Sequence, residues 1–280
     1  MTGLLLFENQ NVMELNAIFN RLWNDYTRLN PSAGKIHKLF ENEGETVVND
    51  HIAFRTLNDP RINIDIIATP FVKNGYKEAG EYVFEDKHLF AKHYELSDKD
   101  PRIFISQLIL EDMPVFVKEA LTGLLDQAEN KLARCEDLIF SGNIFEPLSY
   151  DIYNRFREVS EYAAWFYVFG FRANHFTVSV NDLHKNNSIE KVNQLLMDNG
   201  FKLNTSGGSI KGTEQDMLRQ SSTLADVVTI HFSEGDYNIP CCYYEFAQRY
   251  RQPDGNVFGG FVAKSADKIF ESTNNYVAGK

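Results

Sequence analysis

The hydrophobic positions of residues 11–29 recur at intervals of three and four, which is the spacing of one face of an α-helix. Val12, Leu15, Ile18 and Leu22 belong to this stripe. The stretch "NPSAG" follows it with residues that interrupt regular structure. The pattern therefore predicts an N-terminal helical region.

From residue 46 the pattern changes to short runs that alternate or are rich in β-branched and aromatic residues. Gly, Asn, Asp and Pro separate these runs, as they commonly separate strands. The runs lie at residues 46–57, 62–72, 80–86, 89–96 and 103–110. They predict a β-sheet in the first half of the chain.

Helical spacing returns at residues 114–140 and again in the aromatic-rich stretch 150–171. After residue 173 the pattern predicts a strand, a helix that ends at Gly200, and then further strands. These elements are expected at residues 174–180, 187–200, 224–232, 239–249 and 255–262.

We combine these elements into one α+β domain over residues 1–280, because no low-complexity linker divides the chain. A central mixed or antiparallel sheet is expected from two half-modules, at about 45–115 and about 171–265. N-terminal helices and a helical middle at about 116–170 complete the prediction.

Composition narrows the class of protein. The chain has 280 residues, of which 43% are hydrophobic, enough for a substantial core. No apolar run approaches the roughly 18 to 20 residues that cross a bilayer, and the first residues lack a basic leader pattern. The cysteines, Cys135, Cys241 and Cys242, are too few and too unevenly spaced for a disulfide framework. We expect a cytoplasmic protein with no membrane partner.

The charge balance limits the partners further. With 28 basic and 39 acidic side chains the formal charge is −11, which disfavours a surface that binds nucleic acid. A small anionic substrate would be repelled at long range, so it needs a local cation, either a metal ion or a placed arginine. The sequence contains no GxSxG, Walker A, GxGxxG or CxxC motif, so esterase, nucleotide-binding and zinc-ribbon functions lack support.

Two strand-like stretches carry a histidine directly after an Asx residue. They are "NDHIAFRTL" at residues 49–57 and "ANHFTVSV" at residues 173–180. Because side chains alternate along a strand, His51 and Arg55 share one face, opposite the apolar positions between them. His175 likewise faces the polar side of its strand. We therefore predict that the two histidines share one metal ion.

The third candidate ligand is Glu245, in the β-prone run "CCYYEFAQRY". A carboxylate buried there without a partner would cost several kcal/mol, and a divalent metal is one partner that removes this cost. Two histidines and one carboxylate form the facial triad of non-haem Fe(II) oxygenases.

Ordinary structural roles remain open for each of these residues. A strand histidine is commonly only hydrogen-bonded, Arg55 could form a salt bridge, and Glu245 could pair with Arg249 or Arg251. Three further histidines compete as ligands or as acid/base groups: His231, His88 and His93.

Five stretches together resemble the DUF1338 family of 2-oxoadipate dioxygenase/decarboxylases, also called 2-hydroxyglutarate synthases. They are "NDHIAFRTL", "KHYELSDKDPRIFISQL", "ANHFTVSVN", "QSSTLADVV" and "CYYEFAQRY". The resemblance implies a fold related to the vicinal oxygen chelate superfamily.

The resemblance also implies an Fe(II) ion held by two histidines and a glutamate, which fall on His51, His175 and Glu245. The substrate-gripping arginine falls on Arg55. The ending "FVAKSADKIFEST" resembles the closing segment of the family and would place Lys264 near the substrate. Zinc or nickel could replace iron during purification, because such a site accepts these metals readily.

The implied reaction converts 2-oxoadipate and O2 into 2-hydroxyglutarate and CO2, a step of lysine catabolism. Two other classes stay open. One is another metal-dependent lyase, isomerase or hydrolase on the same scaffold, since a fold does not fix a function. The other is a non-catalytic module that binds a metal or a small acid and closes the coordination sphere with protein ligands. The sequence does not predict the oligomeric state.

Overall fold

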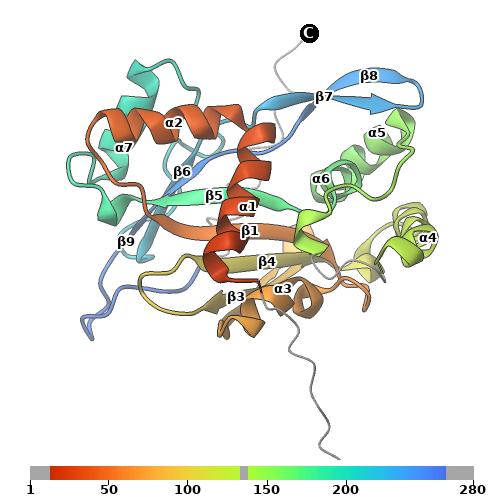
Figure 1. The fold of residues 1–280 in the computed structure, drawn as a ribbon, viewed down its shortest axis with the longest axis horizontal. Coiled ribbons are helices and arrows are strands. Elements are labelled where there is room, and N and C mark those ends of the chain that lie inside the picture. The colour runs from red at the N-terminus through yellow and green to blue at the C-terminus, as the bar shows by residue number, and fades with distance from the viewer. Residues whose placement is uncertain (1–12, 133–137, 263–280) are drawn as a thin grey trace, which may run out of the picture.

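The computed structural model describes residues 13–132 and 138–262 (Figure 1). The helices there are α1 (Leu15–Leu29), α2 (Pro31–Asn42), α3 (Ile64–Lys73), α4 (Val115–Leu132), α5 (Tyr150–Val159), α6 (Glu161–Phe169) and α7 (Ile189–Asp198). The strands are β1 (Asn49–Leu57), β2 (Lys77–Phe84), β3 (Leu89–Glu95), β4 (Arg102–Leu108), β5 (Ala173–Ser179), β6 (Leu218–Ser222), β7 (Val227–Phe232), β8 (Gly235–Pro240) and β9 (Glu245–Arg249).

Seven strands form one mixed sheet in the order β2, β3, β4, β1, β5, β9, β6. The antiparallel pair β1 and β5 lies at its centre, and each of these strands has a parallel neighbour on its other side, β4 and β9 respectively. Strands β7 and β8 form a separate hairpin, which Figure 1 shows beside α5 and α6. The sheet thus joins the two halves of the chain through β1 and β5.

The two halves follow the same plan. In the first, β1 is followed by α3 and by three antiparallel strands, the last of which returns beside β1. In the second, β5 is followed by α7, β6 and β9, and a bridge between Lys211 and Gln220 adds a segment beyond β6. The predicted α+β class and the mixed sheet of two half-modules are confirmed. The extent of the single domain stays a prediction.

Residues 62–72 were predicted as a strand, but residues 64–72 belong to α3 instead. The side chain of Asn63 accepts a hydrogen bond from a backbone N–H of the first turn, as an N-cap does. Ile64, Ile67 and Phe71 are buried at helical spacing. The β-branched composition concealed this helical stripe, and tertiary packing overrode the local propensity.

Other predicted boundaries also differ. The strand predicted at residues 239–249 divides between β8, which ends at Pro240, and β9, which begins at Glu245. The stretch "NPSAG" begins a second helix, α2, with Pro31 in the first helical turn, where its missing N–H costs nothing. Residues 255–262, predicted as a strand, contain only the isolated bridge between Arg251 and Val257.

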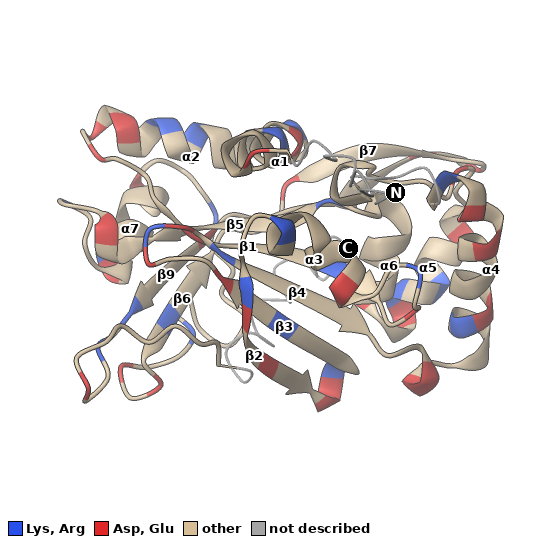
Figure 2. Ribbon diagram, turned by 60° about the horizontal axis from the view of Figure 1, so that its bottom comes forward, with Lys and Arg blue, Asp and Glu red and all other residues tan. Residues whose placement is uncertain are grey.

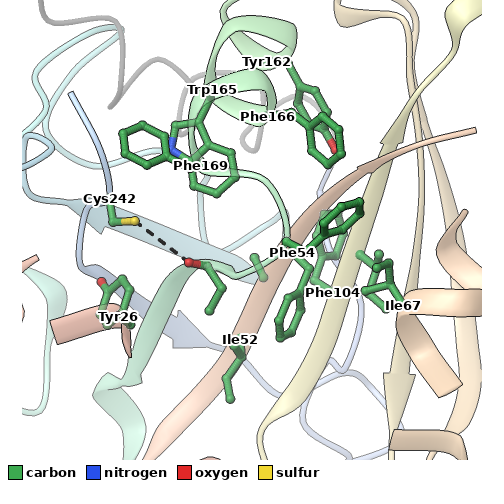
Figure 3. Packing of buried hydrophobic residues seen from close by; sticks show 14 of the residues in the cluster. Tyr26, Ile52, Phe54, Ile67, Phe104, Tyr162, Trp165, Phe166, Phe169 and Cys242 are labelled. Atoms are coloured by element: carbon green, nitrogen blue, oxygen red, sulfur yellow. Dashed lines mark hydrogen bonds between the residues drawn. The ribbon is translucent and has the colours of Figure 1, made fainter. Parts of the chain in front are cut away.

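Strand β1 is buried on both faces, because helices cover one side and the curled sheet encloses the other. On the helix side the ring of Phe54 lies 5.6 Å from that of Phe71 on α3. Figure 3 shows Ile52 and Phe54 within this packing, together with Cys242, whose thiol is 3.9 Å from the Ala173 carbonyl oxygen. Polar side chains on the opposite face of β1 are therefore enclosed.

Charged residues lie mainly outside this core. Figure 2 shows acidic and basic residues mixed along helices such as α2 and α4, whereas the central strands carry few of them. Among the described helices, none combines the length and the apolar character that crossing a bilayer requires.

Candidate metal centre

The structure brings together His51 on β1, His175 on β5 and Glu245 at the start of β9. One potential ligand atom from each residue lies within 4.8 Å of the others, and all three side chains are buried. Strand β5 lies between β1 and β9, so neighbouring strands present all three residues. The sheet order therefore brings together residues that are far apart in the sequence.

Both imidazoles direct Nε2 toward one carboxylate. Nε2 of His51 lies 3.6 Å from Oε1 of Glu245, and Nε2 of His175 lies 3.3 Å from Oε2. The two rings are 5.5 Å apart between centroids and nearly perpendicular, at 84°. This arrangement suits a cation between the three groups, although metal binding by these residues stays a prediction.

Asp50 and Arg249 fix the orientation of His51. The Asp50 carboxylate lies 2.7 Å from Nδ1 of His51 and accepts two hydrogen bonds from Arg249, at 2.6 and 2.9 Å. Burial alone would raise the pKa of Asp50, but Arg249 and these hydrogen bonds hold this pKa well below its usual range. The ionised carboxylate can only accept, so Nδ1 of His51 carries the proton and Nε2 presents its lone pair. The hydroxyl of Thr177 lies 3.1 Å from this Nε2 and can donate to it.

Asn174 has the same role for His175 that Asp50 has for His51. Its Oδ1 lies 3.0 Å from Nδ1 of His175. Burial lowers the pKa of His175 well below its usual value, and the neighbouring His51 and Arg55 lower it further. Burial also lowers the pKa of His51. Both shifts favour the neutral ring, which is the form that binds a metal.

Glu245 is the least satisfied member of the group. Burial raises its pKa to about 8, even though Gln220 donates a hydrogen bond of 2.5 Å to Oε1. Within the described residues, Oε2 has no hydrogen-bond donor. This oxygen faces the lone pair of His175, so it needs either a proton or a cation between them. The donor set of two neutral imidazoles and one carboxylate thus fits a divalent metal ion.

The first half of the chain supplies no fourth ligand at the matching position. In the register of the sheet Glu245 lies opposite Thr177, two residues after His175. Phe104 lies opposite Ala53, the matching residue two places after His51. The ring of Phe261 packs 4.7 Å from that of Phe104 and 4.8 Å from His51. An apolar wall therefore occupies the place of a fourth donor, and three protein ligands leave positions open for exogenous ones.

Arg55 lies further along β1 and is buried. Its NH1 donates hydrogen bonds of 3.0 and 3.1 Å to the two carboxylate oxygens of Glu161 at the start of α6. The guanidinium carbon also lies 4.9 Å from the ring centre of Tyr162 and 5.1 Å from that of Trp165. A buried cation thus stands in the same half-module as His51.

A cavity of about 240 Å³ borders the Arg55 end of this region. Its lining includes Lys87, Arg157, Glu161 and Tyr162. Glu161 and Tyr162 also contact Arg55, so they separate the cavity from the buried guanidinium. The two cations in the lining, Lys87 and Arg157, are matched by two carboxylates, Asp86 and Glu161, so the formal charges of this approach balance.

The competing histidines lie elsewhere. His231 is exposed on the β7–β8 hairpin, where Nδ1 is 2.7 Å from Asp236. His88 is partly exposed after β2, and His93 is buried with Nδ1 at 2.9 Å from the hydroxyl of Tyr82. None of the three belongs to the group of potential metal ligands found in the described residues.

The structure pairs both arginines that were considered as partners of Glu245 with other groups. Glu245 does not pair with Arg249, which binds Asp50, and Arg251 donates to the carbonyl of Gly255 instead. Lys264 lies outside the described residues.

Sequence reasoning missed Gln220 and Glu161, and it considered Arg249 as a partner of Glu245 rather than of Asp50. The sequence shows an Asx residue before each histidine, and in the structure the side chain of each Asx residue lies within hydrogen-bonding distance of Nδ1 of that histidine.

A family model described as 2-oxoadipate dioxygenase/decarboxylase matches residues 9–143 and 139–256. The crystal structure of hydroxyglutarate synthase from Oryza sativa, in complex with 2-oxoadipate, is 32% identical to this chain. It superimposes with a TM-score of 0.87, covering 92% of this chain and 91% of the rice chain. The resemblance inferred from the sequence is confirmed.

A crystal structure from Shewanella frigidimarina, from a protein suggested to be a hydrolase, is 45% identical. It superimposes with a TM-score of 0.85 and covers 89% of this chain and 98% of its own. A glyoxalase superfamily structure from Ralstonia eutropha superimposes with a TM-score of 0.68 at 18% identity, covering 88% of this chain and 84% of its own. This last similarity concerns the fold alone and agrees with the predicted vicinal oxygen chelate architecture.

Proposed function

The chain belongs to the 2-oxoadipate dioxygenase/decarboxylase family, and we propose that it converts 2-oxoadipate and O2 into 2-hydroxyglutarate and CO2. The reaction balances, because both oxygen atoms of O2 remain in the hydroxy acid while the carboxyl group next to the ketone leaves as CO2. The enzyme is thus an oxidoreductase that acts on a 2-oxo dicarboxylic acid.

One observation carries this proposal. Oε2 of Glu245 is buried without a hydrogen-bond donor among the described residues, and the oriented lone pairs of His51 and His175 face the same carboxylate. These three residues would hold Fe(II), which when bound supplies the centre where the 2-oxo acid and O2 are activated. Zinc or nickel would fit the same donors in purified protein.

The residues around the triad keep it in a binding-competent state. Asp50 and Asn174 hold the Nδ1 protons of the two histidines, so that both Nε2 lone pairs point inward. Phe104 and Phe261 cover one side of the centre and exclude water from it. The chain thereby leaves open coordination positions while limiting access by solvent.

Arg55 supplies the local cation that a dianionic substrate requires on a chain of net charge −11. It would bind the distal carboxylate, while the 2-oxo acid group lies at the metal centre. Tyr162 and Trp165 hold the guanidinium from the sides, and Glu161 neutralises it in the ligand-free protein. A bidentate contact between Arg55 and the substrate would set the length of acid that fits.

A hydrolase is the second candidate, because the protein from S. frigidimarina was suggested to be one. A metal with two histidines and a glutamate also suits hydrolysis. An oxygen electrode separates the two functions. Protein reconstituted with Fe(II) under reducing conditions should consume O2 when 2-oxoadipate is added and release an equal amount of CO2. Substrate turnover at an unchanged rate without O2 would favour a hydrolase or lyase.

A further inference from the structure

The hydroxyl group of Tyr243 is buried without a described hydrogen-bond partner. The whole residue is 0% exposed, and its hydroxyl oxygen has no donor or acceptor within hydrogen-bonding distance among the described residues. Buried hydroxyl groups in folded proteins almost always have a partner, because leaving one unpaired is costly. An exception beside a candidate active centre suggests that the partner is a bound molecule.

Tyr243 stands beside the metal ligands rather than in the main core. It precedes Glu245 by two residues, and its ring stacks on the imidazole of His175 with centroids 4.7 Å apart and planes inclined by 25°. Its apolar contacts form a small cluster with Ala225, separate from the large hydrophobic core. One face of the Tyr243 ring thus packs against a candidate metal ligand, His175.

Tyr243 is also linked to Arg55 through Trp165. Burial raises the pKa of Tyr243 well above its usual value, Glu245 raises it further, and Arg55 opposes this rise. Arg55 is in turn influenced by Tyr243. The ring of Trp165 lies 5.1 Å from the Arg55 guanidinium carbon, and its Nε1 donates a hydrogen bond to the carbonyl of Cys241, two residues before Tyr243. Because Tyr243 also stacks on His175, an acid held at the metal centre and at Arg55 would pass near it.

We propose that Tyr243 is a substrate-binding residue whose hydroxyl donates a hydrogen bond to a carboxylate oxygen of the bound 2-oxo acid. This inference rests on the proposed function, because it uses the same acid, held at the metal centre and at Arg55. Glu245 already accepts from Gln220 through Oε1 and would give Oε2 to the metal, which leaves the ligand as the acceptor for Tyr243.

Tyr244 offers a matched control. Its hydroxyl is also buried without a described partner, and the residue is likewise 0% exposed. Its ring, however, packs in the main core, 5.8 Å from Trp23 and 5.4 Å from Phe246. Removing this hydroxyl makes the same chemical change away from the metal ligands.

The test compares wild type, Tyr243→Phe and Tyr244→Phe by isothermal titration calorimetry with 2-oxoadipate. Each protein is loaded with Fe(II) and kept under anaerobic conditions, so that binding is measured without turnover. We expect Tyr243→Phe to raise the Kd by about tenfold to a hundredfold, as loss of a hydrogen bond to a charged group does. Tyr244→Phe should leave the Kd unchanged.

Thermal unfolding of the ligand-free proteins gives a second measurement. Tyr243→Phe should unfold at a temperature no lower than wild type, because the hydroxyl that it lacks has no hydrogen-bond partner within residues 13–132 and 138–262. An unchanged Kd for Tyr243→Phe would overturn the inference, as would a clear loss of ligand-free stability, which would reveal an internal structural bond.

Failure of the proposed function would look different. Wild-type protein that does not bind 2-oxoadipate would refute both the proposed substrate and the role of Tyr243. Wild-type protein that binds the acid but consumes no O2 in air would refute the reaction alone, and the Kd comparison would still decide the role of Tyr243.

Discussion

Oε2 of Glu245 lies 3.3 Å from Nε2 of His175, and no described residue donates a hydrogen bond to that carboxylate oxygen. Asn174 is placed to accept the only ring proton of the neutral imidazole, so the two facing atoms are both acceptors when the carboxylate is ionised. Burial makes this contact unfavourable without a shared proton or a cation. The pair is therefore the structural feature that most strongly supports the proposed metal ion.

Glu245→Gln should separate metal binding from folding. The amide keeps the shape of the side chain but removes the buried negative charge, so the metal-free variant should be at least as stable as metal-free wild type. Its affinity for divalent metal should fall by more than the roughly 10- to 100-fold that loss of an outer-shell partner costs. Metal analysis by mass spectrometry and thermal unfolding measure the two effects.

Glu190→Gln is the matched control for this change. Glu190 is exposed and pairs with Arg219 away from the metal centre, so its variant should keep the metal content of wild type. Equal metal content in all three proteins would contradict the assignment of Glu245 as a ligand.

Asp50 and Asn174 hold equivalent histidines but should respond differently to substitution. Asp50→Asn leaves the buried Arg249 without its carboxylate partner, which should cost about 3 to 5 kcal/mol of stability in addition to weakening metal binding. Asn174→Ala removes only the hydrogen-bond acceptor of His175 Nδ1. Metal affinity should therefore fall about 10- to 100-fold, with a much smaller loss of stability. Denaturant unfolding and metal titration test this contrast. Equal stability losses in the two variants would mean that the Arg249 pair has no special energetic role.

Arg55→Lys should retain the metal and impair recognition of a dicarboxylic acid. A lysine keeps the charge but loses the planar fork that binds a carboxylate through two nitrogens. We expect KM for 2-oxoadipate to rise by about 10- to 100-fold, the effect of losing a charge-assisted contact worth about 1.5 to 3 kcal/mol.

A substrate without the distal carboxylate is the control for Arg55. Wild type and Arg55→Lys should act on 2-oxohexanoate with similar, low efficiency, because neither can use the arginine contact. If the substitution impaired both acids equally, Arg55 would be a structural residue that supports β1 through Glu161.

The candidate ligands could be predicted because strand alternation is a local rule. His51 and His175 each follow an Asx residue and face the polar side of a strand, and both features can be read from a few adjacent residues. Glu245 could be proposed because a carboxylate in a β-prone run needs a partner, and the resemblance implied the same residue as a ligand. The order of β1, β5 and β9 that places it beside the histidines could not be read from the sequence. The identity of the metal stays a prediction.

The supporting contacts were beyond the reach of sequence patterns. Arg249 meets Asp50 across 199 positions, and Glu161 meets Arg55 across 106, because the packing of distant elements decides these pairs. Helix α3 was missed for a related reason, since burial of its apolar stripe outweighs the strand propensity of its β-branched residues. His231 is not a candidate ligand because it is exposed on the β7–β8 hairpin, and its strand-like sequence does not reveal this exposure.

Turnover of 2-oxoadipate in isotopically labelled dioxygen tests the central claim most directly. The Fe(II)-loaded protein should form 2-hydroxyglutarate that carries two labelled oxygen atoms, one in the new carboxylate and one in the new hydroxyl group, and no product should form when oxygen is excluded. Mass spectrometry of the product distinguishes these positions after fragmentation. Product without label, or product formation at an undiminished rate under anaerobic conditions, would contradict the assignment of this chain as a dioxygenase.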